Sequence, residues 1–192
     1  TTSSVVSDGT KPVWEVTEPA AHLTELDALL DFINEVRESL AVEPVVFNEE
    51  LQAAAQAHAD FIATHRAVYE AEGHSYDDQG VVSYEGVSYH DQIEGLAGFT
   101  GLTADDRAKT AGYEGACFNE IIAFKPTAVG AMQASLETLY HRFAITGPRV
   151  TEIGYAEAGE GVRIINVLKV GTRDEQVEVE PSAAITGEGT SE

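Results

Sequence analysis

The chain of 192 residues is long enough for one domain with a full hydrophobic core and short for two. Its 33 acidic residues outnumber its 11 basic residues and give a net charge of −22. Phosphate recognition needs clustered Lys and Arg, so this charge argues against binding to nucleic acid or to anionic lipid surfaces. The single cysteine, Cys117, excludes an intramolecular disulfide framework, and no apolar run is long enough for a transmembrane segment.

The two ends of the chain differ in composition from its middle. Residues 1–21 mix Ser, Thr, Pro and charged residues around Trp14, and the residues from Arg173 onward lack an apolar cluster. We therefore expect an extended N-terminal arm at 1–21, a packed domain at 22–171 and an acidic C-terminal tail at 172–192. The start at Thr1, without a methionine or an apolar leader, is typical of a processed secretory protein or of a trimmed chain.

Two helices are predicted in the first half of the domain. Thr24 and Asp27 form a capping-box pattern, apolar residues then recur at helical spacing up to Leu40, and Pro44 ends the helix. After the short extended passage "PVVF", Asn48 caps a second helix with the sequence "EELQAAAQAHADFIATHRA". Residues 70–102 are rich in Gly, Ser, Tyr and Asp and are predicted to form long loops.

The second half of the domain predicts two further helices and a hairpin. The segment "TADDRAKTAG" is a short helix with Thr103 and Asp106 as its cap and Gly112 as its stop. Pro126 begins a longer helix, which ends at "GPR" and whose apolar stripe comprises Val129, Met132, Leu136, Leu139 and Phe143. The runs "TEIGYAEA" and "GVRIINVLKV" are separated by a Gly-rich turn and predict a β-hairpin. Helices followed by paired strands favour an α+β domain with helices covering an antiparallel sheet.

Among the six histidines, His58 and His65 share the apolar stripe of the second helix. We interpret both as hydrogen-bonded structural residues, since they are too far apart along the helix to coordinate the same metal ion. His22 lies in the predicted N-terminal region and His90 in a predicted loop, and neither belongs to a periodic pattern that would indicate its role.

Two other histidines have context that bears on function. His74 lies in the loop "EGHSYDDQG" and becomes a candidate ligand only if partners elsewhere in the chain face it. His141 lies off the apolar stripe of its predicted helix and is either a surface histidine or a site residue. Glu137 precedes it by one turn on the same face and could orient the ring through its far nitrogen.

Glu120 is the carboxylate with the most informative surroundings. It lies within the apolar segment "CFNEIIAF" and is expected to be at least partly buried. Burial of an ionised carboxylate is costly unless a cation, a hydrogen-bond donor or a metal compensates. The alternatives are a salt bridge with Arg107 or Arg142, or a place in a functional site, while the nearby Cys117 is interpreted as a small buried thiol.

Several common catalytic patterns are absent from the sequence. There is no G-x-S-x-G elbow, no H-E-x-x-H motif, no phosphate-binding glycine loop and no complete calcium-loop pattern. Redox and nucleotide chemistry are therefore not expected.

The order of these features resembles the CAP superfamily, which comprises cysteine-rich secretory proteins, insect antigen 5 and plant pathogenesis-related proteins, and in particular its disulfide-free bacterial branch. Four stretches that together span about residues 24–171 carry the resemblance: "LLDFINEVRESLAVEPVVFNEELQAAAQAHADFIA", "GHS", "RAKTAGYEGACFNEII" and "LYHRFAITGPRVTEIGYA". No single stretch is specific, but their order is.

The resemblance implies an α-β-α sandwich with a cleft over the sheet, in which two histidines and a glutamate face each other and can bind Zn²⁺. Carried over by position, these residues are His74, Glu120 and His141, with the imidazoles as metal ligands and Glu120 as the base. It also implies a secreted or cell-envelope location. Two protein ligands make a weak site that leaves coordination positions open for water.

The sequence departs from the family pattern near the site. Ser135 replaces a common tryptophan, while Asn119 and Ile121 replace the glycine and asparagine that flank the motif glutamate. Glu137 lies one position away from the place where some family members have a second glutamate. It is therefore only a weak candidate for a catalytic residue. These departures leave the fold assignment intact and weaken any assignment of enzyme activity.

Three functions remain open from the sequence. The first is a secreted metal-binding domain with hydrolytic capacity, in which a metal ion at the histidines acts as Lewis acid. The second is a non-catalytic extracellular module that binds a lipid, glycan or envelope component through the cleft and the loops of residues 76–102, where the amphipathic aromatic residues are Tyr76, Tyr84, Tyr89 and Phe99. In the third, the site residues only tie the cleft together by hydrogen bonds, and enzyme status stays open because a fold does not fix a reaction.

Overall fold

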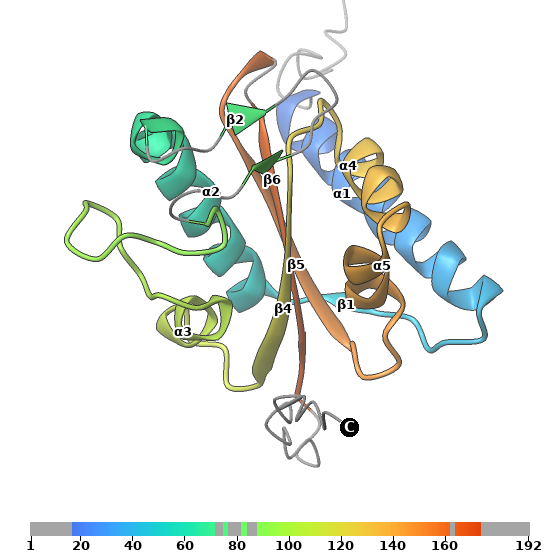
Figure 1. Cartoon of the computed structure of the whole chain (residues 1–192). Helices are drawn as coiled ribbons and strands as arrows, with labels where there is room; N and C mark the ends of the chain where they lie inside the picture. The colour runs from blue at the N-terminus through green and yellow to red at the C-terminus, as the bar shows by residue number, and fades with distance from the viewer. Residues whose placement is uncertain (1–16, 72–74, 77–81, 84–87, 162–163, 174–192) are drawn as a thin grey trace, which may run out of the picture.

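The computed structural model describes residues 17–71, 75–76, 82–83, 88–161 and 164–173 (Figure 1). Its elements in chain order are α1 (Thr17–Ser39), β1 (Val46–Phe47), α2 (Glu49–Ala71), β2 (Ser75–Tyr76), β3 (Val82–Ser83), α3 (Ala104–Thr110), β4 (Ala116–Ala123), α4 (Ala128–Leu136), α5 (Leu139–Thr146), β5 (Glu152–Ala158) and β6 (Ile165–Thr172).

Four of these strands form one sheet in the order β1-β5-β6-β4. The predicted hairpin is confirmed, because β5 and β6 pair in antiparallel fashion with Tyr155 opposite Leu168. Strand β4 adds to the far side of β6 in antiparallel fashion, whereas the short β1 pairs with β5 in parallel. The sheet is therefore mixed, with β1 and β4 at its edges.

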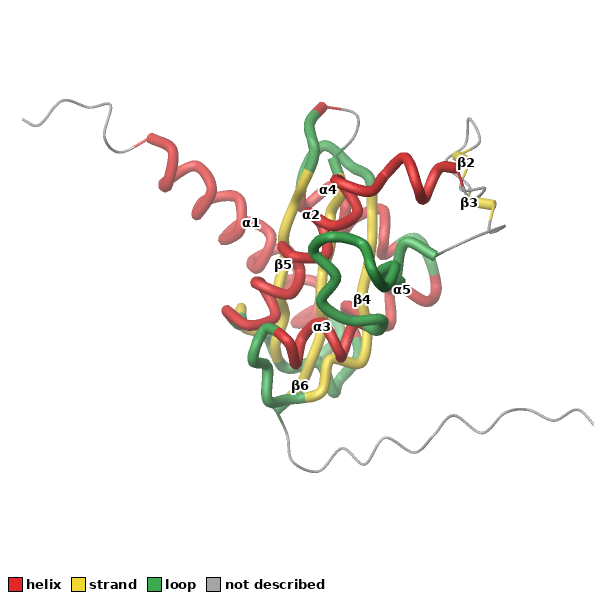
Figure 2. The backbone as a smooth tube through the Cα atoms, turned by 90° about the vertical axis from the view of Figure 1, so that its left-hand side faces the viewer, coloured by secondary structure: helices red, strands yellow, loops and turns green. Residues whose placement is uncertain are grey.

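Helices cover both faces of this sheet. Figure 1 shows α2 and α3 on one side and α1, α4 and α5 on the other, which is the α-β-α sandwich expected from the sequence. Figure 2 views the molecule from the α2 and α3 side and shows the loop of residues 88–102 in front of the strands and next to α3. Buried apolar clusters lie on both sides of the sheet, with Leu168 and Val170 in the cluster of α1, α4 and α5, and Val167 in the cluster of α2. A third cluster lies between α2 and α3.

A close backbone approach places α2 against the sheet. A Cβ atom added to Gly154 of β5 would lie 2.2 Å from the carbonyl carbon of Leu51, so only glycine fits at this position. The Asn48 N–H also donates to the Ile153 carbonyl at 2.9 Å, which fixes the start of α2 to the end of β1 and to β5.

The predicted caps of two helices are confirmed. The Asn48 side chain accepts a hydrogen bond from the Leu51 N–H at 2.8 Å at the start of α2. Thr103 and Asp106 form a reciprocal capping box at the start of α3, and Gly112 follows the helix with φ of 96°, a conformation that favours glycine.

The first helix differs from its predicted bounds. It begins at Thr17, so Thr24 and Asp27 lie inside the helix and do not cap it. It ends at Ser39, before Pro44, because Ala41 adopts φ of 55° in the turn that follows. Most of the two terminal segments lies outside the described residues, so the division at residues 22–171 stays a prediction.

The helix predicted from Pro126 is two helices. Thr127 caps α4, and the chain leaves the helical conformation at Thr138, whose φ of −104° and ψ of 141° are extended, before α5 begins in a new direction. The predicted single apolar stripe is therefore wrong at its C-terminal end. Leu139 and Phe143 are 59% and 62% exposed because the change of direction takes them away from the core.

One buried arginine joins α1 to the end of α5. The Arg37 side chain is fully buried and donates to main-chain carbonyls of Glu43, Ile145, Gly147 and Val150 at 2.7–3.1 Å. These bonds satisfy one carbonyl in the last turn of α5 and three carbonyls in the segments that follow α1 and α5.

Candidate functional site

Strand β4 brings the segment "CFNEIIAF" into the sheet, and Glu120 is only 5% exposed. The predicted burial of this carboxylate is confirmed. The strand itself was not predicted, because its apolar residues do not alternate regularly and a register shift interrupts its pairing between Cys117 and Asn119. The shift leaves Glu120 directly opposite Lys169 of β6.

Two buried cations compensate the charge of Glu120. Arg107 of α3 donates through Nη2 to both carboxylate oxygens at 2.9 and 3.2 Å, and Lys169 contacts Oε2 through Nζ. The salt bridge to Arg107 was one of the two alternatives raised by the sequence. The other candidate, Arg142, instead donates through Nε to the Leu136 carbonyl.

Two histidines complete the surroundings of the carboxylate. His90 places Nδ1 3.2 Å from Oε1 of Glu120, and the fully buried His58 places Nε2 3.5 Å from the same oxygen and 3.0 Å from the Tyr89 carbonyl. Burial lowers the pKa of His58 to about 3, so its ring is neutral at physiological pH. His58 and His65, whose Nε2 lies 2.8 Å from the Ala97 carbonyl, make the main-chain contacts expected of structural residues.

The electrostatics of the cluster keep Glu120 ionised. Burial alone raises its pKa, but the hydrogen bond with His90 and the charges of Lys169 and Arg107 together hold the pKa of this carboxyl well below its usual range. Its oxygens are already engaged by these donors. Glu120 is therefore a poor proton acceptor at neutral pH, and its chemistry is that of a counter-ion and of an orienting group for His90.

A cleft of about 510 Å³ opens over this cluster at the β4 edge of the sheet. Residues from four segments line it: His90 and Asp91 from the loop before α3, Thr103 and Ala104 from the start of α3, Asn119 and Glu120 from β4, and Tyr140, His141 and Phe143 from α5. The cleft therefore joins the two helical layers across the edge strand. Glu120 forms part of its floor, while Arg107 and Lys169 lie behind the floor.

Thr138 holds the ring of His141. The His141 Nδ1 lies 2.8 Å from the Thr138 hydroxyl, and the same hydroxyl lies 3.1 Å from the Ser135 carbonyl. When the hydroxyl donates its hydrogen to this carbonyl, Nδ1 of the ring donates to the hydroxyl, and the lone pair of the neutral imidazole lies on Nε2. Burial, with a smaller effect of His90, lowers the pKa of His141 and favours this neutral form.

The His141 ring has a different hydrogen-bond partner in the structure from the one that the sequence predicts. Glu137, the weak candidate, ends α4 as an exposed residue, and Thr138 takes the contact with Nδ1. The break between α4 and α5 is the physical reason, because Glu137 and His141 no longer lie one turn apart on a single helix.

The tautomer of His90 follows from its contact with Glu120. Its Nδ1 faces Glu120, which is ionised and can only accept, so Nδ1 carries the hydrogen and Nε2 carries the lone pair when the ring is neutral. The side chain is 40% exposed and lines the same cleft as His141. Sequence reasoning missed His90 because a histidine in a long loop has no periodic neighbours to mark it.

The structure describes two of the three residues carried over from the family resemblance. Glu120 and His141 line one cleft together with His90, and their functional roles stay predictions. His74 lies outside the described residues, so its role stays a prediction. Within the part of the chain that the structure describes, no group of three or more His, Cys, Asp or Glu side chains is arranged to hold a metal ion.

Two of the aromatic residues expected to offer a contact surface are packed inside. Tyr89 is 5% exposed and stacks on Tyr69 with 5.0 Å between ring centroids, and Phe99 packs against the same apolar cluster. The side chains of Tyr76 and Tyr84 are not among those that the structure describes. The exposed aromatic surface beside the cleft comes instead from α5, where Tyr140 is 83% exposed.

Cys117 is a buried free thiol, as the sequence indicated. Burial raises its pKa to about 11, so the reactive thiolate is not populated at neutral pH.

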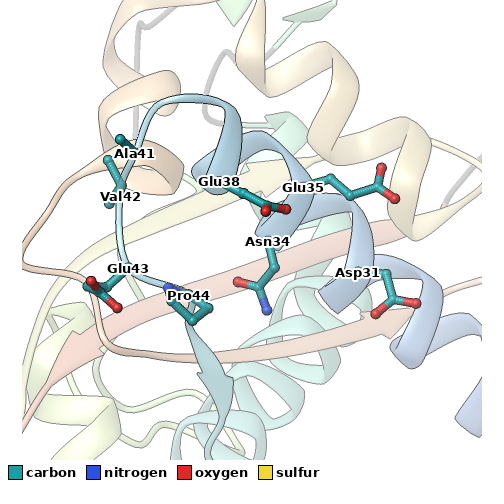
Figure 3. Close-up of a pocket in the computed structure, with 8 residues that line it drawn as sticks. All are labelled: Asp31, Asn34, Glu35, Glu38, Ala41, Val42, Glu43 and Pro44. Atoms are coloured by element: carbon teal, nitrogen blue, oxygen red, sulfur yellow. The ribbon is translucent and has the colours of Figure 1, made fainter.

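A second hollow, of about 610 Å³, lies at the C-terminal end of α1 and the turn after it (Figure 3). It is lined by carboxylates of Asp31, Glu35, Glu38 and Glu43, by Asn34, and by Ala41, Val42 and Pro44. The Asn34 side chain is engaged in a reciprocal pair of hydrogen bonds with the Val45 main chain at 2.8 and 3.1 Å. The four carboxylates make this hollow acidic, and no imidazole or basic group is among the described residues that line it (Figure 3).

In the described residues, no helix combines the length and apolar character needed to cross a bilayer.

Comparisons with known proteins agree with this architecture. The sequence profile of CAP, the cysteine-rich secretory protein family, matches residues 30–162. The fold is similar to that of an outer surface protein from Borrelia burgdorferi, with a TM-score of 0.51 and 18% sequence identity over 78% of this chain and 93% of that chain. It is also similar to an extracellular protein with an SCP domain from Bacillus anthracis strain Ames, with a TM-score of 0.50 and 17% identity over 85% of this chain and 45% of that chain. No curated protein matches the chain significantly.

Proposed function

This chain belongs to the CAP family, and from that premise we propose that it is an extracellular-type binding domain whose cleft holds a divalent metal ion, with Zn²⁺ as the first candidate. The observation that carries the proposal is that His90 and His141 line the same cleft with Nδ1 of each ring held by an oxygen atom. In His90, and in His141 when Thr138 donates to the Ser135 carbonyl, the neutral ring then has its lone pair on Nε2. Metal-binding histidines are commonly oriented in this way through their other nitrogen.

The donor set fits a weak and open site. His90 and His141 would supply two imidazole ligands, and His74 remains the ligand expected from the family resemblance. Asp91 also lines the cleft and offers an oxygen donor. A site with two or three protein ligands leaves positions for water or for an organic ligand, and a bound Zn²⁺ would supply Lewis acidity there.

Glu120 is better suited to positioning than to proton transfer. Its oxygens are occupied by Arg107, Lys169 and His90, and its low pKa disfavours taking up a proton. The base role expected from the resemblance therefore stays a prediction that these contacts do not favour. Hydrolytic activity likewise stays a prediction, and we propose binding as the primary function.

We further propose a secreted or cell-envelope location. The support is the CAP family itself and two fold neighbours whose names describe an outer surface protein and an extracellular protein. The net charge of −22 suits a protein kept apart from its neighbours by self-repulsion.

Calorimetric titration with Zn²⁺ at neutral pH tests the metal site. We expect a saturable heat for the wild-type protein and a loss of affinity of at least about tenfold in each of His90→Ala and His141→Ala, because each removes one of few ligands. His74→Ala tests the ligand predicted from the resemblance. His65→Ala is the matched control, since this ring contacts a carbonyl away from the cleft.

The double variant decides the proposal. If His90→Ala/His141→Ala gives the same heats as the wild-type protein while retaining its circular dichroism spectrum, the metal site proposed for this cleft does not exist.

A further inference from the structure

Two aromatic side chains form an exposed wall on one side of the cleft. Tyr140 and Phe143 are 83% and 62% exposed and line the cleft together, three residues apart on α5. We call this pair the aromatic wall. Single exposed aromatic residues are common on protein surfaces, but two exposed rings that line the same cleft offer an apolar contact surface to a bound molecule.

The other residues that line the cleft offer hydrogen-bonding groups of both kinds. Asn119 accepts the Glu120 N–H through Oδ1 at 2.8 Å, which leaves the two N–H donors of its amide nitrogen for another partner. Nε2 of neutral His90 is an acceptor, Nε2 of His141 is a further hydrogen-bonding atom, and the exposed Asp91 carboxylate is a second acceptor. A ligand for this cleft needs an apolar face for the wall and hydroxyl or amide groups for the floor.

The charges near the cleft select against anionic ligands. Asp91 lines the cleft, and the chain as a whole carries −22. The cations Arg107 and Lys169 lie behind the floor and are engaged with Glu120. A lipid chain is equally unsuited, because it would bury these polar groups without hydrogen bonds, which is costly.

We propose that this cleft binds an uncharged saccharide, with the apolar face of a pyranose ring against Tyr140 and Phe143 and its hydroxyl or N-acetyl groups bonded to Asn119 and the two imidazoles. A sugar combines these features in one molecule, since its axial C–H groups form an apolar face and its hydroxyls both donate and accept. The cleft of about 510 Å³ is within the usual size range of small-ligand sites. This inference goes beyond metal binding and does not require a bound ion.

Titration followed by NMR, with the full chain, tests the proposal. The probes are the uncharged trisaccharides tri-N-acetylchitotriose and cellotriose, the anionic trigalacturonic acid, and phosphatidylcholine vesicles. We expect at least one uncharged trisaccharide to bind in the presence of EDTA, and Tyr140→Ala to weaken it by at least about tenfold through loss of the stacking surface. Tyr140→Trp keeps a ring at this position and should restore binding.

Two variants serve as matched controls. Leu139→Ala removes an exposed apolar side chain from the same helix, and Phe118→Ala removes an exposed aromatic ring from β4, but neither residue lines the cleft. Both should bind the trisaccharide as the wild-type protein does. All of these side chains are exposed, so their replacement should leave the fold intact.

The proposal is overturned if neither uncharged trisaccharide binds, if Tyr140→Ala binds as tightly as the wild-type protein, or if the anionic sugar binds more tightly. If the protein binds the vesicles through Tyr140 and binds no saccharide, the ligand of the cleft is a lipid surface and the saccharide proposal is wrong. Because these titrations contain EDTA, failure of the zinc experiment leaves their outcome unaffected, and the two proposals can fail separately.

Discussion

The buried neutral His58 should make the stability of this protein depend on pH in a way that one substitution removes. Its pKa is about 3 in the folded protein, against 6.5 for an exposed histidine. Below pH 6.5 the unfolded chain therefore takes up a proton at this position that the folded protein does not. The stabilisation is complete above pH 6.5 and declines as the pH falls toward 3.

The size of the effect follows from the two pKa values. Between about pH 7.5 and pH 4.5, the unfolded chain gains close to one proton at His58 while the folded protein gains none, which lowers the free energy of unfolding by about 2.5 kcal/mol. This result is the same for any folded pKa well below 4.5. The buried location of the ring, with no exposed surface, makes screening by solvent a minor correction.

The assay compares His58→Gln with the wild-type protein by urea unfolding, followed by circular dichroism at the two pH values. Glutamine keeps an N–H donor for the Tyr89 carbonyl and has no charged form. The variant should lose about 2.5 kcal/mol less than the wild-type protein between the two pH values, whatever its stability at neutral pH. His65→Gln controls for loss of a histidine from α2.

The test compares how much the free energy of unfolding of each protein changes between the two pH values, because the many carboxylates are also protonated as the pH falls. Lowering the pH relieves their mutual repulsion, and this changes the free energy of unfolding of both proteins by the same amount. If the free energies of unfolding of His58→Gln and the wild-type protein fall in parallel, the argument that His58 is held neutral by burial is refuted.

Three further substitutions test the buried contacts by the same measurement. Glu120→Gln should lower the free energy of unfolding by about 3–5 kcal/mol, because it leaves two buried cations without a counter-ion. Arg37→Met should lower it by about 3 kcal/mol or more, since four main-chain carbonyls lose a charged donor. Gly154→Ala should cost at least about 2 kcal/mol, because the new methyl group overlaps the backbone of Leu51 and forces α2 away from β5.

Exposed residues provide the controls for these substitutions. Glu94→Gln and Arg149→Met make the same chemical changes at the surface and should change stability by less than about 0.5 kcal/mol. If Glu120→Gln changes stability as little as Glu94→Gln, the carboxylate is not the counter-ion of Arg107 and Lys169. If Arg37→Met changes stability as little as Arg149→Met, Arg37 does not stabilise the contact between α1 and the end of α5.

Local signals in the sequence determined much of the secondary structure. The caps at Asn48 and Thr103 and the hairpin of β5 and β6 follow from interactions between residues close in the chain, and such interactions can be recognised from spacing. The burial of Glu120 was also predictable, because its immediate neighbours are apolar. The order of these features was sufficient to indicate the CAP resemblance, which the family profile confirms.

The tertiary structure decided which side chains meet, since their partners are distant in sequence. The counter-ions of Glu120 come from α3 and β6, and no local pattern distinguished Arg107 from Arg142 or pointed to Lys169. His90 became a site residue only because its loop folds against the edge strand, and Thr138 replaced Glu137 beside His141 because α4 and α5 change direction. Spacing along one helix or strand fixes local geometry, whereas a cleft between separate elements depends on how they pack.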